Sequence, residues 1–560
     1  MNSPNPALVT QRAAQRLPRV ALLLLCAAYV LPGLFGRDPW RHADVTAFGF
    51  MASISEGRSP WLNPSVAGLS ADPALLPYWL GASFIRWFGP WLGEPLAARI
   101  PFALLLVLVL VFTWYSTYHL ARTEGARPLP FAFGGEADPV DYARAIADGA
   151  LLAAIATLGL LLLGHETTPE LAQLAGVSLF LYAMAASHHR RWRARVALLV
   201  SLPALAASGA PGVAVALGTA GVLAALWSRP AGAGRLWLWI AASAAVAAAL
   251  ATALGAWAWH VRLPSRADQW LSIGKQVVWF TWPAWPLACW TLWRWRRHLH
   301  RAHIALPLGC VLVALATWLL MGGRDRALML ALPPLAVLAA FALPTLQRST
   351  AAAIDWFSVF FFSICALAIW VIYIAMHTGV PAKPAANVAR LVPGFEPLFQ
   401  PIELAFAVLA TLAWLGLVQW RTGRNRHPLW KSLVLPASGV ALSWLLLMSL
   451  WLPLFDYARS YGPLLARLSA HLPMNECVAA VDVPPSQLAA MGFVASYDVD
   501  AATPLAATPC HWLVRVEPPR SERPAPAGWR EVAREPRLTT RDEVTVVFRR
   551  TGNGAAPAGS

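Results

Sequence analysis

The sequence has few charged residues for its length. Of its 560 residues only 13% are Asp, Glu, Lys or Arg, whereas a soluble domain carries roughly 25%. Together with 29 Trp and long Leu/Ala/Val tracts, this scarcity excludes a soluble cytoplasmic enzyme and a disordered chain. Many apolar runs exceed the roughly 18–20 residues that a helix needs to cross hydrocarbon, whereas outer-membrane strands alternate and are only about 10 residues long. The composition predicts an α-helical polytopic membrane protein.

Several motifs of soluble enzymes are missing as well. There is no phosphate loop Gly-x-x-x-x-Gly-Lys-Ser/Thr, no placed Gly-x-Gly-x-x-Gly, no His-Glu-x-x-His and no zinc-type Cys pairing. The formal charge of +16 does not indicate nucleic acid, because the basic residues cluster in short loops between apolar segments. We therefore expect a lipid bilayer, and no nucleic acid, as a partner.

About 13 apolar segments are predicted to span a bacterial inner membrane. A polar N-terminus (1–19) in the cytoplasm and strict alternation place three basic loops inside, at 188–195, 294–301 and 421–426. A cleaved signal peptide is the alternative for the first segment, but residues 31–37 lack a small-x-small cleavage site. The predicted segments are 20–35, 96–120, 146–164, 170–187, 196–209, 211–227, 236–259, 274–293, 303–321, 327–346, 355–377, 399–420 and 432–453.

The composition changes after residue 454, where the transmembrane region (20–454) ends. Charge returns, and three strand-like runs (476–482, 511–516 and 543–549) and a helix-like stretch (486–493) predict a small periplasmic α/β domain over 455–550. Residues 551–560 are expected to be a flexible tail. Cys477 and Cys510, each next to a predicted strand, would pair in an oxidising periplasm; two buried free thiols are the alternative.

Chemistry is expected in the first outer loop, 37–95. Two acids, Asp38 and Asp44, flank Arg41 and His42 at the membrane surface. A carboxylate there would act as general base on a sugar hydroxyl, and an arginine would hold a phosphate by paired hydrogen bonds. An ordinary solvated loop after a membrane helix is the competing interpretation.

The motifs of this loop resemble the GT-C superfamily of membrane glycosyltransferases. The pattern Asp-x-x-Arg-x-Ala-(Asp/Glu) after the first span, a Gly-x-x-Pro-Trp-type segment, and an acid before Leu-x-Tyr-Trp-Leu are similar to the aminoarabinose-transferase-like branch, which includes relatives of protein mannosyltransferases. The resemblance is specific mainly over 34–102. It implies about 13 spans, a large first periplasmic loop, a C-terminal periplasmic domain and a polyprenyl-phosphate sugar as donor.

The resemblance also implies roles for individual residues. Asp38 falls on the catalytic aspartate, Arg41 on the motif arginine, Asp44 on the closing acid and Asp72 on the second acid, with Tyr78 in register. Three positions depart from the pattern, since Pro39 replaces an acid, His42 a tyrosine and Pro73 a lysine that the family is thought to use on the lipid phosphate. Another cation must then do that work, or the donor is handled differently, or the chain is a degenerate member.

Two other outer segments offer groups for this site. His165 and Glu166 lie in a short turn where the family often has site-lining polar residues, with a helix-capping turn as the alternative. Arg324 and Arg326 precede a Leu- and Pro-rich span and are the best candidates for holding a phosphate, with arginines that snorkel to lipid headgroups as the alternative.

The sequence thus predicts a glycosyltransferase that moves a sugar from an undecaprenyl-phosphate-like donor to a periplasmic lipid A, glycan or protein. Asp38 would be the base, Asp44 and Asp72 would orient groups or bind a divalent metal ion, and Arg41, Arg324 and Arg326 would stabilise the leaving phosphate. A transporter or flippase of lipid-linked saccharides is disfavoured, because the spans lack ionisable groups at their middles. A non-catalytic GT-C-like protein is the other alternative.

Overall fold

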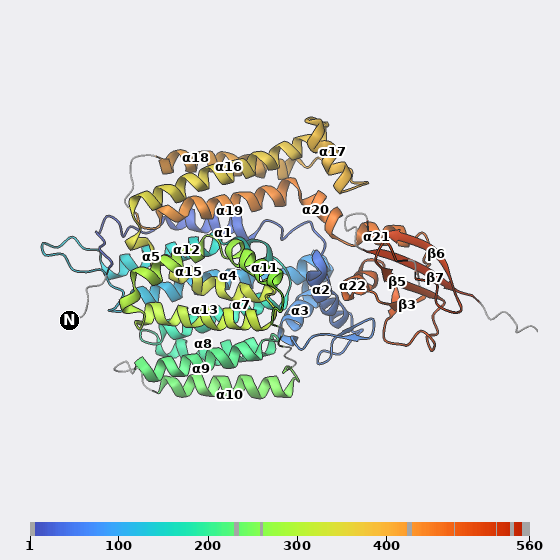
Figure 1. The fold of residues 1–560 in the computed structure, drawn as a ribbon, viewed down its shortest axis with the longest axis horizontal. Helices are drawn as coiled ribbons and strands as arrows, with labels where there is room; N and C mark the ends of the chain where they lie inside the picture. Colours follow the sequence, from blue (N-terminus) through green and yellow to red (C-terminus); the bar gives the residue numbers. More distant parts are fainter. Residues whose placement is uncertain are drawn as a thin grey trace, which may run out of the picture.

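We describe a computed structural model that covers residues 6–228, 235–257, 261, 263–422, 428–474, 476–521, 523–537 and 543–551. A bundle of long helices makes up most of the molecule, and a mixed α/β domain formed by the C-terminal part stands at one end (Figure 1). Most of the predicted tail (552–560) and part of the basic loop 421–426 lie outside the described residues.

The bundle contains the segments predicted to span the membrane, each as one helix or as consecutive shorter helices. Its helices are α1 (Arg19–Val30), α4 (Glu94–Ala121), α5 (Pro139–Ala156), α6 (Leu158–Leu163), α7 (Pro169–Ala186), α8 (Arg191–Ala207), α9 (Pro211–Ser228), α10 (Leu236–Ala253), α11 (Ala267–Phe280), α12 (Ala284–Arg294), α13 (Ala302–Leu320), α14 (Asp325–Leu328), α15 (Leu332–Ala340), α16 (Arg348–Thr378), α18 (Pro401–Thr422) and α19 (Lys431–Leu450).

Among the described residues, eight helical segments are long and apolar enough to cross a membrane. The shorter apolar helices α1 and α9 accompany them, and the predicted spans 146–164 and 274–293 are each interrupted, at Thr157 and around Trp282. The chain is therefore a multi-pass helical membrane protein, while the number of spans stays a prediction.

Close helix contacts hold the bundle together. A Cβ on Gly439 of α19 would lie 2.2 Å from the Phe362 ring of α16, and a Cβ on Gly149 of α5 would lie 2.4 Å from Leu343. Small residues allow such approach where no hydrophobic effect operates between helices in lipid. The segment Asp325–Thr345 is almost wholly enclosed, whereas α18 is mostly exposed at the edge of the bundle.

Outside the bundle, the first loop forms a layer between the helices and the C-terminal domain (Figure 1). The chain leaves α1, forms α2 (Arg41–Ser55), a short hairpin and α3 (Leu75–Leu92), and then enters α4. The hairpin strands are β1 (Ser65–Val66) and β2 (Leu69–Ser70), and the other outer helices are α17 (Ala382–Leu391), α20 (Leu452–Arg459) and α21 (Gly462–Leu468).

The C-terminal domain is built on a five-stranded sheet in the order β4-β3-β5-β7-β6. Strand β3 is parallel to β4 and β5, and the β5, β7 and β6 neighbours are antiparallel. The three predicted strands and the predicted helix are present, and β4 and β6 are additional. The elements are β3 (Cys477–Val481), α22 (Pro485–Val494), β4 (Asp498–Asp500), β5 (Trp512–Glu517), β6 (Trp529–Pro536) and β7 (Val544–Arg550).

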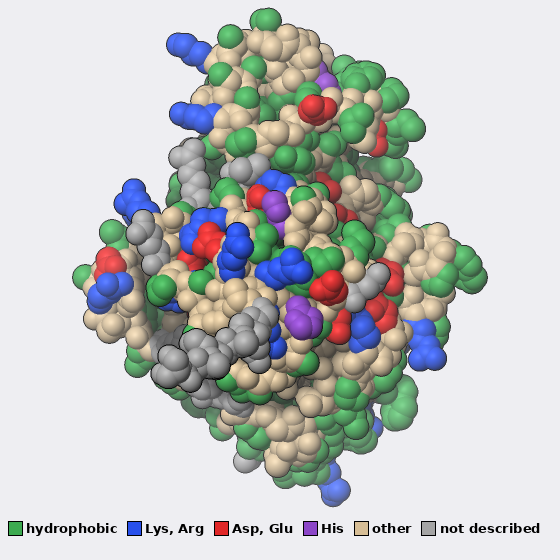
Figure 2. Space-filling model, turned by 90° about the vertical axis from the view of Figure 1, so that its right-hand side faces the viewer, with side chains coloured by type: hydrophobic (Ala, Val, Ile, Leu, Met, Phe, Trp, Pro, Cys, Tyr) green, Lys and Arg blue, Asp and Glu red, His purple; other side chains and the backbone are tan. Residues whose placement is uncertain are grey.

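Helix α22 docks this domain onto the first loop. Phe493 of α22 meets Phe48 of α2 edge to face, with ring centroids 4.6 Å apart. A Cβ on Gly49 would lie 2.4 Å from the Ala489 Cβ, so the two helices touch almost backbone to backbone. The end of the molecule that carries this domain has Lys, Arg, Asp, Glu and His side chains gathered across its middle (Figure 2).

Candidate functional site

Directly after α1, the first loop crosses the end of the bundle that carries the C-terminal domain. Gly33, at φ +77°, passes close to α19, where a Cβ would lie 2.9 Å from the Met448 sulfur. The Trp444 Nε1 of α19 donates a hydrogen bond to the Pro32 carbonyl at 3.0 Å. This close passage brings Arg37 and Asp38 to the boundary between the helices and the outer layer.

Asp38 lies beside a second carboxylate, Asp456 of α20. The backbone N–H of Asp38 donates to Asp456 Oδ1 at 2.8 Å, and the Trp40 Nε1 donates to the same oxygen at 2.9 Å. Burial and, secondly, the charge of Asp456 raise the pKa of Asp38, while the charge of Arg99 opposes them. A raised pKa makes Asp38 a stronger base than an ordinary aspartate.

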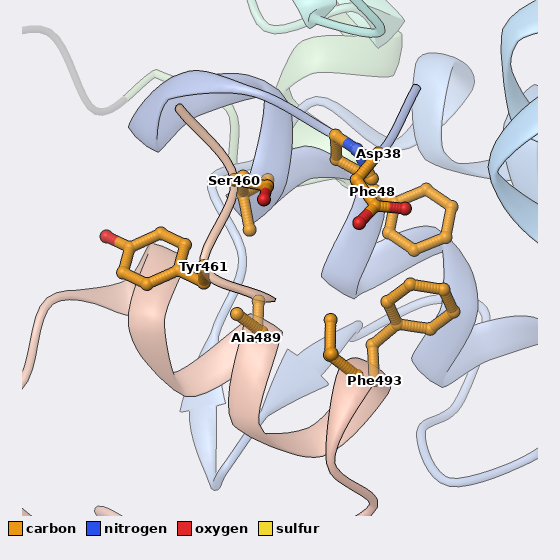
Figure 3. Close-up of a pocket in the computed structure, with 10 residues that line it drawn as sticks. Asp38, Phe48, Ser460, Tyr461, Ala489 and Phe493 are labelled. Atoms are coloured by element: carbon orange, nitrogen blue, oxygen red, sulfur yellow. The ribbon is translucent and has the colours of Figure 1, made fainter. Parts of the chain in front are cut away.

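A small pocket opens next to Asp38, and the C-terminal domain supplies its other wall. Phe48 lines it from α2, and Ala489 and Phe493 line it from α22 (Figure 3). Ser460 and Tyr461 line another side from the segment between α20 and α21. A group that reaches Asp38 from this side would therefore contact the C-terminal domain as well.

Two buried arginines lie near this aspartate, and neither was singled out from the sequence. Arg37 is 7% exposed and Arg99 of α4 is 4% exposed. Arg37 donates to the His165 carbonyl, and its guanidinium lies 4.8 Å from the Trp40 ring centroid. Burial lowers the pKa of Arg37, and the charges of Asp44, Glu166 and Asp456 oppose that shift.

Each of these arginines has a buried N–H that a ligand could use. In the described part of the chain, Arg37 Nε and Arg99 Nη2 are buried without a hydrogen-bond partner. Arg99 also lines a narrow pocket with apolar walls, which Val30, Phe102 and Leu106 contribute from α1 and α4. Buried unsatisfied donors are costly, so an anion at this position would find donors already in place.

Asp44 is fully buried, at 0% exposure. Its Oδ1 accepts hydrogen bonds from the Thr167 N–H at 2.7 Å and from the Thr167 hydroxyl at 2.6 Å, and its Oδ2 accepts from the Trp40 N–H at 2.9 Å. The carboxylate thus ties the start of α2 to the turn before α7. This agrees with an orienting role, which stays a prediction.

Arg326 reaches the same turn from α14. Its Nη2 donates to Glu166 Oε2 at 2.6 Å, and its Nη1 lies 3.8 Å from Glu170 Oε2. The structure thus brings together two residues that the sequence analysis assigned to one site, Arg326 and Glu166. The phosphate-binding role that it gave to the arginine stays a prediction. Arg324, by contrast, is exposed at the start of α14.

His165 is held between α1, α6 and α19. Its Nδ1 lies 2.7 Å from the Leu161 carbonyl oxygen and its Nε2 lies 2.8 Å from the Tyr29 carbonyl oxygen. Its ring is 4.5 Å from that of Trp444. Burial lowers the pKa of His165 to about 4, and the contacts of its ring with the two carbonyl oxygens oppose that shift. These contacts connect α1, α6 and α19.

Tyr78 and Asp72 lie on the α3 flank. Tyr78 is buried in α3 with its ring 5.4 Å from that of Phe50. Burial, followed by the charges of Asp72 and Glu170, raises the pKa of Tyr78. Through Glu170 this flank adjoins the Arg326 ion pairs, whereas Asp72 itself is exposed.

His42 contacts the C-terminal domain. Its Nδ1 lies 2.8 Å from the Ser486 hydroxyl of α22 and 3.3 Å from the Tyr461 hydroxyl. Arg41 is the first residue of α2, and its side chain lies outside the described part of the structure.

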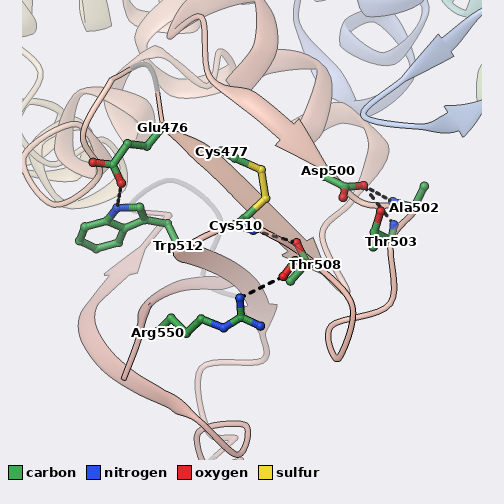
Figure 4. Close-up of a disulfide and its surroundings, with 9 residues drawn as sticks. All are labelled: Glu476, Cys477, Asp500, Ala502, Thr503, Thr508, Cys510, Trp512 and Arg550. Carbon is green, nitrogen blue, oxygen red and sulfur yellow. Dashed lines mark hydrogen bonds between the residues drawn. A yellow bond between two sulfur atoms is a disulfide. The ribbon is translucent and has the colours of Figure 1, made fainter. Parts of the chain in front are cut away.

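Cys477 and Cys510 are joined in a disulfide, with their Cα atoms 4.9 Å apart (Figure 4). This separation lies within the usual range for a disulfide. Next to it, the Trp512 Nε1 donates to Glu476 Oε2 at 2.7 Å. The bond links β3 to the segment that leads into β5.

The predicted carboxylates do not form a metal centre. Within the described ranges, no group of three or more His, Cys, Asp or Glu side chains is placed to hold an ion. Asp44 has both oxygens engaged by protein donors, so the residues present do not fit the divalent ion considered from the sequence.

Comparison with known proteins identifies the fold. No protein-family model and no curated relative matches the chain. Two crystal structures of ArnT from Cupriavidus metallidurans are similar to it. The one bound to undecaprenyl phosphate has a TM-score of 0.57 at 14% identity, covering 97% of this chain and 98% of that chain. The apo structure has a TM-score of 0.58 at 15% identity, covering 94% and 96%. The helical membrane fold with a C-terminal sheet domain, which the sequence resemblance implied, is thus confirmed, and the number of spans stays a prediction.

Proposed function

We propose that the chain is a membrane glycosyltransferase that moves a sugar from a polyprenyl phosphate to an acceptor on the outer face of a bacterial inner membrane. The observation that carries the proposal is the placement of Asp38, a half-buried carboxylate of raised pKa, near the buried cations Arg37 and Arg99. The shared fold supports it, because one of the ArnT structures is bound to undecaprenyl phosphate.

The donor phosphate would bind at Arg99 and Arg37. Both have a buried N–H to offer, and the apolar walls beside Arg99 suit the first isoprene units of a polyprenyl chain. These two arginines would replace the family lysine that is Pro73 here. Arg326 is less suited to this task, because Glu166 and Glu170 already neutralise it.

Asp38 would act as the general base. Its carboxylate takes the proton of the acceptor nucleophile, whose lone pair attacks the anomeric carbon from the side opposite the phosphate. The carbon–oxygen bond to the phosphate breaks as the new bond forms, which inverts the anomeric centre. Negative charge develops on the leaving phosphate, where the fixed guanidinium groups stabilise it. A raised pKa serves proton transfer better than an ordinary aspartate would.

The acceptor would reach Asp38 from the side of the small pocket between α2 and α22, which would have to widen to admit it. With the N-terminus and the basic loops 188–195 and 294–301 in the cytoplasm, this pocket and the C-terminal domain face the periplasm. Lipid A, another glycan or a protein would each be accessible there.

The test follows sugar transfer in detergent. Purified wild type receives a labelled polyprenyl-phosphate sugar and total membrane lipid as acceptor. Asp38→Asn is expected to lower transfer by about 100-fold or more, the usual contribution of a general base. The control is Asp268→Asn, an exposed acid that pairs with Arg266 on α11 and should leave transfer unchanged.

The same assay separates an enzyme from both alternatives. A transporter or flippase gives no covalent product in detergent, because no second compartment exists. A non-catalytic protein gives no product with any donor. Equal transfer by wild type and Asp38→Asn would show that Asp38 is not the base.

A further inference from the structure

A second polar cavity lies at the end of the bundle opposite the candidate active site. It has a volume of about 470 Å³ and is formed by the start of α16, the end of α18 and the start of α19. These helix ends lie on the far side of the bundle from the C-terminal domain (Figure 1). Nothing in the proposed transfer reaction uses them.

Two of the charged side chains that line the cavity are buried. Arg421 is 8% exposed and Lys431 is 5% exposed. Arg421 forms an ion pair with Asp355 and donates from Nε to the Lys431 carbonyl at 3.2 Å. The Lys431 ammonium lies 4.7 Å from the Trp420 ring centroid. The cations are therefore held inside the protein, unlike snorkelling side chains on a loop.

The charges in the cavity do not balance. Among the described residues that line it, Arg348, Arg421 and Lys431 are basic and Asp355 is the one acid. The site thus has two more positive than negative charges. Charge complementarity favours an anion with more than one acceptor oxygen, such as a phosphate.

The remaining lining is apolar and continues onto the surface that faces lipid. Leu343, Leu346, Val359 and Trp356 contribute to the wall. Trp356 is 57% exposed, and Phe360 follows on the same helix at 60%. A ligand with an anionic head and hydrocarbon chains would match both the basic lining and the apolar wall of the cavity.

We propose that this cavity binds the headgroup of an anionic phospholipid, with the acyl chains lying along α16 and α18. Basic pockets between transmembrane helices at the inner face suit such lipids. The site is separate from the donor site, so it holds a structural lipid of the surrounding leaflet.

The test measures lipid binding to the full-length protein in detergent by native mass spectrometry. Phosphatidylglycerol is titrated against wild type and against Arg348→Gln/Lys431→Gln, which keeps the Arg421–Asp355 pair intact. At about fivefold per basic residue near a phosphate, the double variant should bind about 25-fold more weakly. Lys431→Arg should restore most of the affinity that Lys431→Gln loses, which separates loss of charge from misfolding.

A control variant and a control lipid test whether binding is specific to the cavity. Arg191→Gln/Arg193→Gln removes two exposed arginines at the start of α8 and should leave binding unchanged. Zwitterionic phosphatidylethanolamine should bind more weakly than phosphatidylglycerol. Equal binding of the two lipids, or an equal loss in the control variant, would overturn the proposal. Displacement by millimolar inorganic phosphate would also overturn it, since that result identifies a free-ion site.

Discussion

The substitution Asp44→Asn tests how the first loop is positioned. The carboxylate is fully buried and accepts three hydrogen bonds. An asparagine oxygen can still accept from the Thr167 N–H and hydroxyl. Its amide nitrogen would then face the Trp40 N–H, so that two donors oppose each other.

The expected cost follows from this geometry. One hydrogen bond to a charged acceptor is lost and one backbone N–H is left buried, which lowers the free energy of unfolding by about 1.5–3 kcal/mol. Asp44→Ala removes all three bonds and should cost about 4–5 kcal/mol, taking the low end of that range for each. Because α2 shifts relative to the turn at 165–168, sugar transfer should also fall, by about 10- to 100-fold.

Denaturant unfolding in mixed micelles, followed by Trp fluorescence, measures the first effect, and transfer measures the second. Asp268→Asn is the matched control and should change neither. The reasoning is refuted if Asp44→Asn unfolds like wild type, within about 0.5 kcal/mol, yet loses transfer. That outcome would place Asp44 in contact with substrate.

Three further predictions concern other parts of the site and the C-terminal domain. Asp456→Asn removes one cause of the raised pKa of Asp38. The acidic limb of the profile of kcat/KM against pH should therefore move to lower pH. A limb that does not move would show that another group titrates. Arg326→Met removes the ion pairs of the buried Glu166 and the partly buried Glu170 and should cost about 3–5 kcal/mol of unfolding free energy. Arg99→Met should mainly weaken donor binding; the reverse pattern would assign the phosphate to Arg326. Cys477→Ser opens a loop of 33 residues and should lower the free energy of unfolding of the full chain by about 3–4 kcal/mol. Wild type should lose the same amount under reducing conditions. An unchanged unfolding midpoint would mean that the thiols are free.

Local patterns were sufficient to predict most of the fold. The apolar runs marked the helices because a membrane span must be long and uninterrupted. Strands β3, β5 and β7 were visible as short runs of Val, Leu and Ala. Strand β6 (Trp529–Pro536) was missed because it lies at the sheet edge, where most of its side chains are exposed and half of them are charged.

The site was harder to predict because its contacts join distant parts of the chain. Asp456 lies 418 residues from Asp38, and nothing in the sequence connects them. Arg99 carried the one available signal, a charged residue inside a long apolar run, which in a membrane segment indicates function. The motif offered both Asp38 and Asp44 as candidates, and only the structure distinguishes the carboxylate that lines a pocket from the one enclosed by hydrogen bonds.

The central claim is that Asp38 takes a proton during sugar transfer and does not hold the donor. The most direct measurement determines donor affinity and single-turnover transfer on the same preparations of wild type and Asp38→Asn, using a labelled polyprenyl-phosphate sugar. The account predicts that Asp38→Asn binds the donor within about twofold of wild type and transfers at least about 100-fold more slowly. Equal transfer rates would contradict it, and so would a variant whose loss of transfer is explained entirely by loss of donor binding.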